Sequence, residues 1–409
     1  MKQIWDVGWR TARLCAVETY FDCPYYERLQ YTGDTRIQAL ISLYVSGDDR
    51  LMRKAIQTLG RSRNGDGILR SRYPAEVDQF IPPFSLYWIN MLHDYWMHRD
   101  DRQFVASMIP TLKSILEWYA RKIDHETGLL GAMPHWNFVD WALPWQWCNE
   151  YPLGGVPPGA ITGGSSIISL QLSYTLADAI ELLRAFGENC EADKYVGIRK
   201  EINKAVWTKC YDSSKGLFAD DIARTSYSQH ASIIAILSDA APAKIQQELF
   251  ERLDSDPSLI QATVYYRFYL FKAMKKVGLA DRYVESLDIW KDMLDRGLTT
   301  FAERPEPSRS DCHAWSASPL YDFLATVCGI EPSSNGFRSV RIAPHPGNLN
   351  RISGKVPHPA GMIEVELKKE KDRMTGTIIL PKGVNGEYKY GHMKMKLKEG
   401  LNQIISSVN

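Results

Sequence analysis

The spacing between helical segments constrains the fold of this chain more than any other feature of its sequence. Between residues 4 and 327, apolar residues recur with the period of amphipathic helices, in about twelve segments. The connections between these segments alternate in length. Short ones lie near residues 47, 99, 187, 239 and 278, and long ones cover residues 19–33, 60–81, 124–164, 210–226 and 297–312. This alternation is typical of consecutive helical hairpins.

Alternate connections of an up-and-down helical array fall at opposite ends of the array. All the long loops are therefore predicted to lie at one end, where loops on a rigid scaffold usually carry binding and chemistry. Six hairpins that close on themselves form an (α/α)6 toroid, which is the fold that we predict. The even-numbered segments are the more apolar ones, so we expect them to form its inner ring.

The sequence pattern changes after Ile330. Residues 337–343, 361–368 and 373–380 are rich in β-branched residues, and 394–397 and 401–405 add short strands. Residues 344–357 are predicted to form a loop with one edge strand. We therefore predict two domains, a mainly α (α/α)6 toroid over residues 1–330 and a small C-terminal antiparallel β-sandwich over residues 331–409. The second domain is expected to support packing.

The charge balance argues against several kinds of partner. Lys and Arg number 49 and Asp and Glu 48, so the net charge of +1 gives no electrostatic basis for binding nucleic acid or an anionic membrane. No apolar run is long enough to span a bilayer. The N-terminus carries an early acid and lacks the apolar stretch of a signal peptide, so the default expectation is a cytoplasmic protein. A missing N-terminal region would instead allow a periplasmic or secreted protein.

The seven cysteines have no repeated spacing, so we expect reduced thiols rather than a disulfide framework or a zinc site. The glycine pairs lack the strand–turn–helix setting of a phosphate loop, and the chain has no nucleophile elbow. We therefore predict neither a metal nor a cofactor. The 12 Trp and 21 Tyr are a notable excess. Buried rings explain most of them, and stacking on carbohydrate can explain the rest.

The first long loop carries the strongest chemical signal. The stretch from residue 22 to residue 34, which covers most of this loop and the residue after it, holds three acids, Asp22, Glu27 and Asp34. Three tyrosines and an arginine lie among them, and a proline and a glycine interrupt any regular helix. Carboxylates can do acid–base work and bind hydroxyls, and rings can stack on pyranose faces, so the loop suits a sugar site. The alternative is a surface loop with capping acids, in which Asp34 caps a helix that begins at Thr35.

A second candidate acid is Glu303, in the last long loop. A toroid places the first and last hairpins side by side, so Glu27 and Glu303 are expected to meet. Glycoside hydrolysis needs one protonated carboxylic acid and one carboxylate, roughly 6.5–9.5 Å apart at an inverting site. Glu306 competes with Glu303 for this role, and a solvated loop acid is the alternative reading of either residue.

Two other regions supply candidate binding residues. Asp140 and Trp141 place a hydrogen-bond acceptor beside a ring, and His313 can either contact a sugar hydroxyl or cap the last helix. Three further tryptophans of the same long loop can stack on sugars or pack the loop: Trp136, Trp145 and Trp147.

The segment 22–34 resembles the signature of bacterial and fungal α-L-rhamnosidases that adopt an (α/α)6 barrel. Those enzymes carry an Asp-Cys-Pro opening, a Glu-Arg pair and a Trp-Thr-Gly-Asp ending, and this chain has Asp22-Cys23-Pro24, Glu27-Arg28 and Tyr31-Thr32-Gly33-Asp34. Further matches are Asp140-Trp141, the Thr-Thr pair ahead of Glu303, and His313. The resemblance covers roughly residues 5–327, and the C-terminal domain also resembles the trailing sandwich of the family.

The resemblance implies an inverting glycoside hydrolase that releases terminal α-L-rhamnose from glycosides or polysaccharides. In that family, the position of Glu27 holds the general acid that protonates the glycosidic oxygen, and the position of Glu303 holds the general base that activates water. With the loop analysis, the candidate substrate-binding residues are Asp22, Arg28, Tyr31, Asp34, Asp140, Trp141 and His313.

Three departures from the family pattern concern the substrate. The family's Arg ahead of the Glu-Arg pair is a tyrosine here, its Trp is Tyr31, and its Trp before the basic Glu is Ala302. The family also usually carries β domains ahead of the barrel, whereas Met1 begins almost at the first helix. Two alternatives therefore stay open: a glycosidase on the same toroid that acts on another terminal sugar, and a non-catalytic carbohydrate-binding relative.

Overall fold

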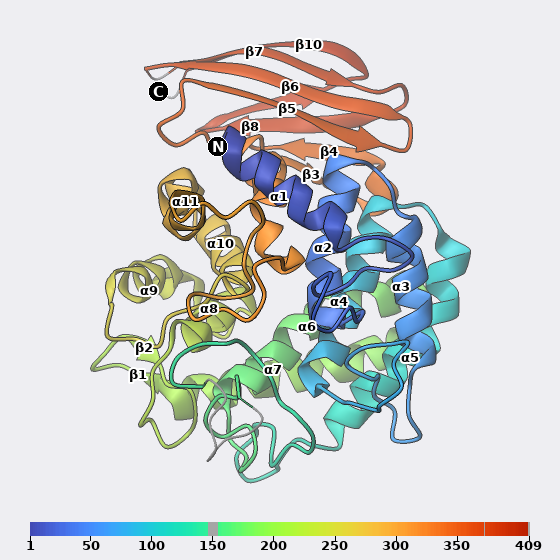
Figure 1. The fold of residues 1–409 in the computed structure, drawn as a ribbon, viewed down its shortest axis with the longest axis vertical. Helices are drawn as coiled ribbons and strands as arrows, with labels where there is room; N and C mark the ends of the chain where they lie inside the picture. Colours follow the sequence, from blue (N-terminus) through green and yellow to red (C-terminus); the bar gives the residue numbers. More distant parts are fainter. Residues whose placement is uncertain (146–153, 372, 408–409) are drawn as a thin grey trace.

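The structure, a computed structural model, describes residues 1–145, 154–371 and 373–407. Helices fill the lower part of the view in Figure 1, and strands cover their upper end. The described part contains twelve α-helices, which confirms the predicted number. Their bounds are α1 Lys2–Leu14, α2 Thr32–Val45, α3 Arg50–Arg61, α4 Pro82–His98, α5 Arg102–Ala120, α6 Ser166–Ala185, α7 Asn189–Cys210, α8 Gln229–Leu237, α9 Ala243–Ser255, α10 Arg267–Lys276, α11 Asp288–Asp295 and α12 Pro319–Asp322.

The even-numbered helices form the inner ring, as predicted from their apolar sequences. In α4, 14 of the 17 residues are buried, whereas the neighbouring α3 buries one face only. Around the ring α2 packs on α4, α4 on α6, α6 on α8 and α8 on α10, and α12 returns to α2. A helix enclosed by others must be apolar on all sides, which is why these segments lack a polar face.

Helix α2 begins three residues earlier than predicted, at Thr32. The sequence suggested a loop there because Gly33 is a poor helix former. The glycine is needed for packing instead, since a Cβ at position 33 would lie 2.6 Å from the ring of Phe84 and 2.8 Å from the hydroxyl of Tyr265. The helix starts early because tertiary contacts override local propensity.

Two other predicted helices are broken. The segment predicted over 280–296 splits into a 3-10 helix, Ala280–Ser286, and α11. The segment predicted over 313–327 divides into a 3-10 turn at Ala314–Ala317, α12, and a π-helical turn at Phe323–Val327. In the second case Pro319 lacks a backbone N–H and takes the first position of α12, so the preceding turn cannot continue into it.

The strands form two four-stranded sheets, in the orders β10-β7-β6-β5 and β3-β4-β8-β9. Residues 344–357 contribute β5 at a sheet edge, as predicted, while β3 and β8 were not predicted. One pair departs from the antiparallel prediction, because β4 and β8 run parallel. The bounds are β3 Ile330–Pro332, β4 Ser339–Ile342, β5 Arg351–His358, β6 Gly361–Glu370, β7 Arg373–Leu380, β8 Asn385–Tyr390, β9 Met393–Leu397 and β10 Gly400–Ser407. Two short strands, β1 Tyr211–Asp212 and β2 Leu217–Phe218, pair within the helical part.

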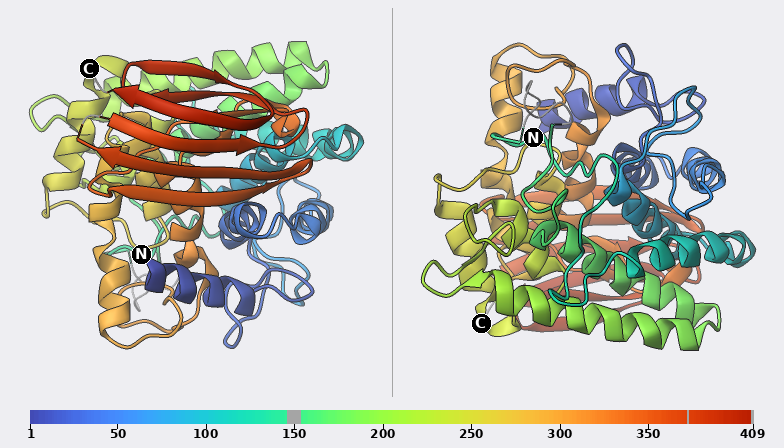
Figure 2. Two further views of the ribbon diagram at one scale, coloured as in Figure 1. Left: turned by 90° about the horizontal axis from the view of Figure 1, so that it is seen from above. Right: turned by 90° about the horizontal axis from the view of Figure 1, so that it is seen from below.

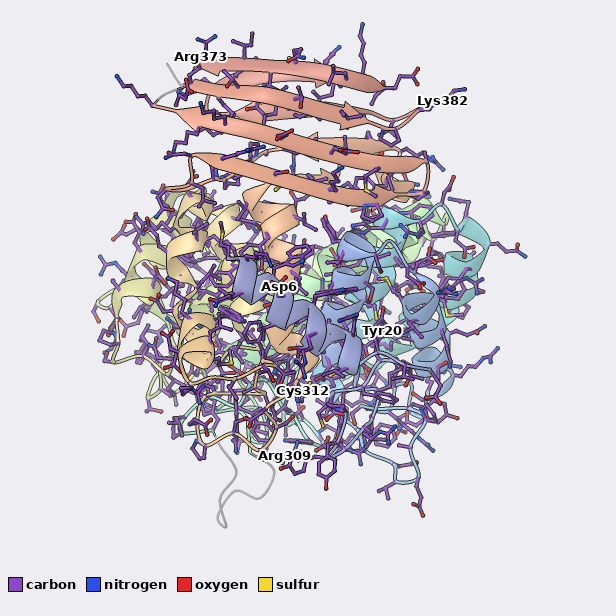
Figure 3. All side chains as sticks on the ribbon, turned by 45° about the horizontal axis from the view of Figure 1, so that its top comes forward. Asp6, Tyr20, Arg309, Cys312, Arg373 and Lys382 are labelled. Carbon is purple, nitrogen blue, oxygen red and sulfur yellow. The ribbon has the colours of Figure 1, made fainter. Side chains whose placement is uncertain are left out.

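Helix α2 links the two ends of the molecule. Near its C-terminal end, Tyr44 donates a hydrogen bond to the carbonyl oxygen of Ile330 at 3.0 Å, and the helix packs on β5. Asp34, near its N-terminal end, lies in the long-loop region. The sheets therefore cover one end of the barrel, seen from above in Figure 2, and the loops occupy the other. In Figure 3 the labelled Arg309 lies far from Arg373 and Lys382 of the β domain.

Of the helices that the structure describes, none combines the length and apolar character that crossing a bilayer requires.

Candidate active site

The loop that joins α1 to α2 folds back on itself and holds its acids in defined places. α1 ends at Leu14 rather than near residue 18, because the chain reverses so that the N–H of Phe21 bonds to the carbonyl of Cys15 at 2.7 Å. Asp22 accepts a hydrogen bond from the N–H of Leu29 at 2.9 Å. The turn between them presents Glu27, whose side chain is 27% exposed.

Hydrogen bonds hold the loop between α11 and the last helical turns in place on both sides of Glu303. The N–H of Glu303 bonds to the carbonyl of Ser310 at 2.9 Å, and the indole N–H of Trp315 donates to the carbonyl of Glu303 at 2.7 Å. The N–H of His313 bonds to the carbonyl of Phe301 at 2.8 Å. These bonds fix the main chain around Glu303, whose side chain is 4% exposed.

Asp34 and His313 form a buried pair that joins the two loops. Nε2 of His313 lies 2.8 Å from Oδ1 of Asp34, and both residues are 2% exposed. Burial raises the pKa of Asp34 to about 6, with His313 opposing the shift. Burial opposes protonation of His313, but Asp34, with help from Glu303 and Asp22, outweighs it and raises the pKa of the imidazole to about 9. The pair is therefore ionic between about pH 6 and pH 9.

The capping alternatives for these two residues are wrong. α2 begins at Thr32, so Asp34 lies inside its first turn, and His313 makes no side-chain capping bond to the turn that follows it. Each side chain instead meets the other across the end of the barrel. Asp34 is further favoured there because a carboxylate near a helix N-terminus interacts well with the helix dipole.

Arg309, which the sequence analysis did not single out, connects the two glutamates. One terminal nitrogen of its guanidinium lies 2.7 Å from Glu27 Oε1, and the other lies 3.5 Å from Glu303 Oε1. Because these nitrogens are roughly 2.3 Å apart, the two oxygens are at most about 8.5 Å from each other. Burial opposes the charge of Arg309, but Glu303 and Glu27 together raise its pKa. No local pattern marks Arg309, since only the fold brings both acids to it.

These groups line one pocket. Its polar side is made by Asp22, Glu27, Asp34, Glu303, Arg309 and His313. Its other walls are apolar or aromatic: Tyr31, Ile81, Phe84, Trp136, Phe138, Trp141 and Trp315. Trp315 stacks on Tyr265 with 4.4 Å between ring centroids, which holds that wall in place. A concave site with aromatic walls and converging acids is suited to a sugar.

Tyr31 occupies the wall position where the resembling family has Trp. Its hydroxyl accepts a hydrogen bond from Arg72 at 2.9 Å, and the guanidinium of Arg72 also lies over its ring. Burial, followed by the charge of Glu27, raises the pKa of the Tyr31 phenol. The hydroxyl therefore stays protonated at the rim of the pocket.

Two predicted binding residues lie outside the pocket. Asp140 is fully buried behind the wall, where it bonds to Nε2 of His230 and to the N–H of Thr263, each at 2.8 Å. Arg28 is exposed, has a positive φ of 53° and lies over the ring of Phe21. The structure thus gives Asp140 a role in holding the loop that carries Trp141, and gives Arg28 no place in the cavity.

The tryptophans of the long loop have different surroundings. Trp136 and Trp141 line the pocket, with 6.1 Å between their ring centroids, and Trp136 donates from its indole to the carbonyl of Gly154 at 2.9 Å. Trp145 is buried against His230. Trp147 lies outside the described residues.

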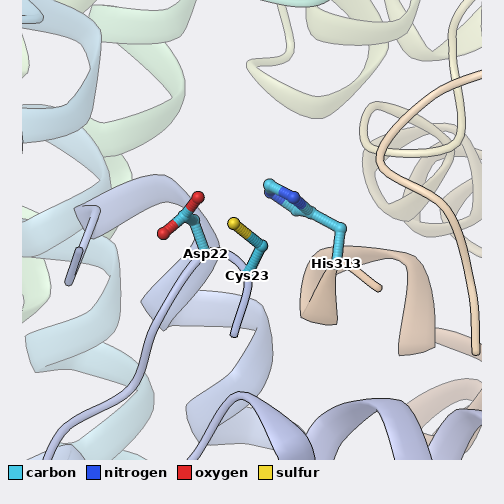
Figure 4. A group of neighbouring side chains, drawn as sticks. All are labelled: Asp22, Cys23 and His313. Atoms are coloured by element: carbon cyan, nitrogen blue, oxygen red, sulfur yellow. The ribbon is translucent and has the colours of Figure 1, made fainter. Parts of the chain in front are cut away.

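Asp22 and His313, which line the pocket, lie close to Cys23 (Figure 4). One potential ligand atom from each lies within 4.8 Å of the others, and within the described ranges no other three His, Cys, Asp or Glu residues do this. Oδ2 of Asp22 and Nδ1 of His313 are buried without a hydrogen-bond partner. Burial raises the pKa of Asp22, with His313 opposing. Such atoms can receive hydroxyl groups of a ligand, and we assign no ion to them.

Two family models match most of the chain. The bacterial alpha-L-rhamnosidase 6 hairpin glycosidase domain matches residues 1–327, and the bacterial alpha-L-rhamnosidase C-terminal domain matches residues 329–390. A curated alpha-L-rhamnosidase of Streptomyces avermitilis is 22% identical over 347 residues, which cover 78% of this chain and 31% of that protein. The chain thus spans about a third of the length of this relative.

Solved structures resemble nearly the whole chain. A rhamnosidase of Bacillus sp. GL1 superposes with a TM-score of 0.82 at 25% identity, covering 95% of this chain and 41% of that one. The alpha-L-rhamnosidase of Streptomyces avermitilis complexed with L-rhamnose gives a TM-score of 0.82 at 17% identity, covering 99% of this chain and 41% of that one. A rhamnosidase of Klebsiella oxytoca with rhamnose bound gives 0.69 at 22% identity, covering 79% and 63%. The Bacillus and Streptomyces chains share the predicted toroid followed by a β domain.

Proposed function

The chain belongs to the bacterial α-L-rhamnosidase family, and on this basis we propose that it is an inverting glycoside hydrolase that releases terminal α-L-rhamnose. In this proposal Glu27 is the general acid and Glu303 the general base. The substrate is a rhamnosyl glycoside or polysaccharide. One observation carries the proposal: Glu27 and Glu303, from the first and last long loops, contact the same guanidinium inside one pocket.

The two carboxyl groups have different surroundings that suit these roles. An inverting site needs room for a water between its base and the sugar, with carboxyl groups roughly 6.5–9.5 Å apart. The bound of about 8.5 Å on the two Arg309-bonded oxygens is compatible with that distance. Glu27, the more exposed of the two, lies at the open side, where the leaving group must depart. Glu303 is enclosed, where a single water can be oriented.

The remaining residues hold the sugar. Asp22 and the Asp34–His313 pair face the pocket with buried polar atoms, which suits the hydroxyl groups of one pyranose. Trp141, Trp136 and the other aromatic walls suit its apolar face and methyl group. Arg309 forms ion pairs with both glutamates, so a glycosidic oxygen at Glu27 and a water at Glu303 would compete with it for the same carboxylates. We propose that substrate binding displaces this side chain.

The proposed reaction then follows from these positions. Glu27 donates its proton to the glycosidic oxygen, and the bond to the anomeric carbon breaks. A water held by Glu303 attacks that carbon from the opposite face while Glu303 takes its proton. The product is the β anomer of L-rhamnose, because a single displacement inverts the configuration.

The test uses p-nitrophenyl α-L-rhamnoside with Glu27→Gln and Glu303→Gln. Each variant is expected to lose roughly 10²–10⁴-fold in kcat, a typical contribution of a general acid or base. Glu306→Gln is the matched control, because Glu306 is an exposed acid of the same loop that pairs with Arg296. The leaving oxygen of an aryl glycoside with a more acidic phenol needs less protonation by the general acid. Such a substrate should therefore restore part of the activity of Glu27→Gln, but it should not restore the activity of Glu303→Gln.

Two further measurements separate the alternatives. An NMR time course that shows the α anomer first would refute inversion, and full activity in both glutamine variants would refute the assignment of the carboxylates. A panel of aryl glycosides tests whether another terminal sugar is preferred. Calorimetric binding of L-rhamnose with no turnover of any glycoside would identify a non-catalytic relative.

A further inference from the structure

Two cysteines from opposite ends of the helical part meet beside the candidate active site. Cys15 follows the last residue of α1 and is fully buried, and Cys312 lies in the loop that carries Glu303 and His313. Their sulfur atoms are 4.0 Å apart, within hydrogen-bonding distance for thiols. Both are reduced in the structure. Cys312 is partly exposed, and its label in Figure 3 lies near that of Arg309 on the loop end of the molecule.

The two thiols have unequal chemistry. The hydrogen bond between them is the main reason why the pKa of Cys312 is lowered and that of Cys15 is raised. Burial also raises the pKa of Cys15, while the hydroxyl of Thr300 and the charge of His313 help to lower that of Cys312. A thiolate is the reactive form of cysteine. The exposed partner is therefore the more nucleophilic one, and a protonated thiol lies next to it.

None of the other described cysteines combines solvent exposure with a direct contact to a second sulfur. Cys190 is exposed, but no other described cysteine contacts it, and Cys210 and Cys328 are buried. Cys23 is buried and close enough to influence Cys15 electrostatically, so it is the competing partner. Within the described part of the chain, only Cys15 and Cys312 make a direct sulfur–sulfur contact.

We propose that Cys15 and Cys312 are an oxidative modification site that a hydroperoxide converts to a disulfide. The Cys312 thiolate attacks a peroxide oxygen, the O–O bond breaks, and a sulfenic acid and hydroxide form. The sulfur of Cys15 then attacks the sulfenic sulfur, an S–S bond forms, and water leaves. In total two thiols lose two electrons and two protons, and one hydrogen peroxide becomes two waters.

The bond would connect the end of α1 to the loop that holds Glu303 and His313. Sulfur atoms 4.0 Å apart must approach to about 2.05 Å, which requires rotation of the two side chains, a shift of the loop toward α1, or both. A shift of about 1 Å in catalytic groups can cost up to 10²-fold in rate. Under the proposed function we therefore expect kcat/KM to fall at least severalfold on oxidation and to recover with dithiothreitol. The cross-link should also raise the unfolding temperature, since it closes a long loop of the unfolded chain.

The experiment oxidises the purified, reduced full-length chain with stoichiometric hydrogen peroxide and maps its peptides by mass spectrometry. Cys15 and Cys23 lie in one tryptic peptide, and Cys312 and Cys328 lie in another. Chymotryptic cleavage near Tyr20 and Trp315 is therefore needed to separate the two cysteines of each peptide. We expect a Cys15–Cys312 cross-linked peptide, two hydrogens lighter than the sum of its parts. Cys312→Ala should abolish it, and Cys190→Ala should retain it.

Each outcome bears on the proposal. A cross-link from Cys312 to Cys23, or a Cys312 sulfinic acid with a free Cys15 thiol, would overturn it. If Cys312→Ala folds poorly, the peptide map of the wild-type chain still shows whether Cys15 and Cys312 form the cross-link. Cross-linking without a change in kcat/KM would overturn the claim about the loop. The peptide map does not depend on rhamnosidase activity, so a failure of the proposed function is distinguishable from a failure of this inference.

Discussion

The buried Asp34–His313 pair gives the sharpest test of the electrostatics of the site. Asp34, together with Glu303 and Asp22, raises the pKa of His313 to about 9, although burial alone would lower it from its ordinary value near 6.5. This difference corresponds to roughly 3 kcal/mol of preference for the imidazolium. Asp34→Asn keeps the size and a hydrogen-bonding group but removes the charge. The pKa of His313 should then fall by about 1–3 units, the effect of losing one adjacent opposite charge. Glu303 and Asp22 remain and still raise it.

The assay is an NMR titration of the chain labelled at histidine. His93 is the internal control, because its pKa is also about 9, with burial opposing and Asp178 raising it, and it lies on α4 away from the pocket. A His313 resonance that still titrates near 9 in Asp34→Asn would refute the argument, as would an equal shift of His93. Since a pKa raised on folding stabilises the protein at low pH, the contribution of His313 in the wild type is present below pH 6.5 and is lost as the pH rises through 9.

Three further predictions concern packing and charge. Gly33→Ala should lower the free energy of unfolding, measured by urea denaturation, by about 1–3 kcal/mol, because the added Cβ would press on Phe84. Gly65→Ala is the control and should change the free energy of unfolding little, because the space around Gly65 is open. Arg309→Met should lower KM for the aryl rhamnoside about two- to fivefold if the substrate displaces this side chain, and an increased KM would contradict the displacement. Glu331→Gln should lower the free energy of unfolding by about 2–4 kcal/mol, because it leaves Lys275, 2.9 Å away, without the carboxylate that it pairs with between the barrel and the β domain. Glu370→Gln is the control, because Glu370 forms an exposed ion pair with Lys368.

The sequence by itself determined the order and number of the helices. Apolar residues on all sides of the even-numbered segments mark helices that others must enclose, and the alternation of loop lengths places the long loops at one end. Asp22, Glu27 and Glu303 were identified for the same reason, since each lies in a long loop. Hydrophobic period and loop length are local quantities, and a sequence displays them directly.

Tertiary structure alone decided which of these side chains share a cavity. It brought Arg309 between Glu27 and Glu303, paired His313 with Asp34, and placed Asp140 behind the wall with His230. It also began α2 at Thr32, one residue before Gly33, and paired β4 with β8 in parallel. Each of these outcomes depends on contacts between residues far apart in the chain. A polar side chain in a loop has many partners within reach, and only the packed fold selects one.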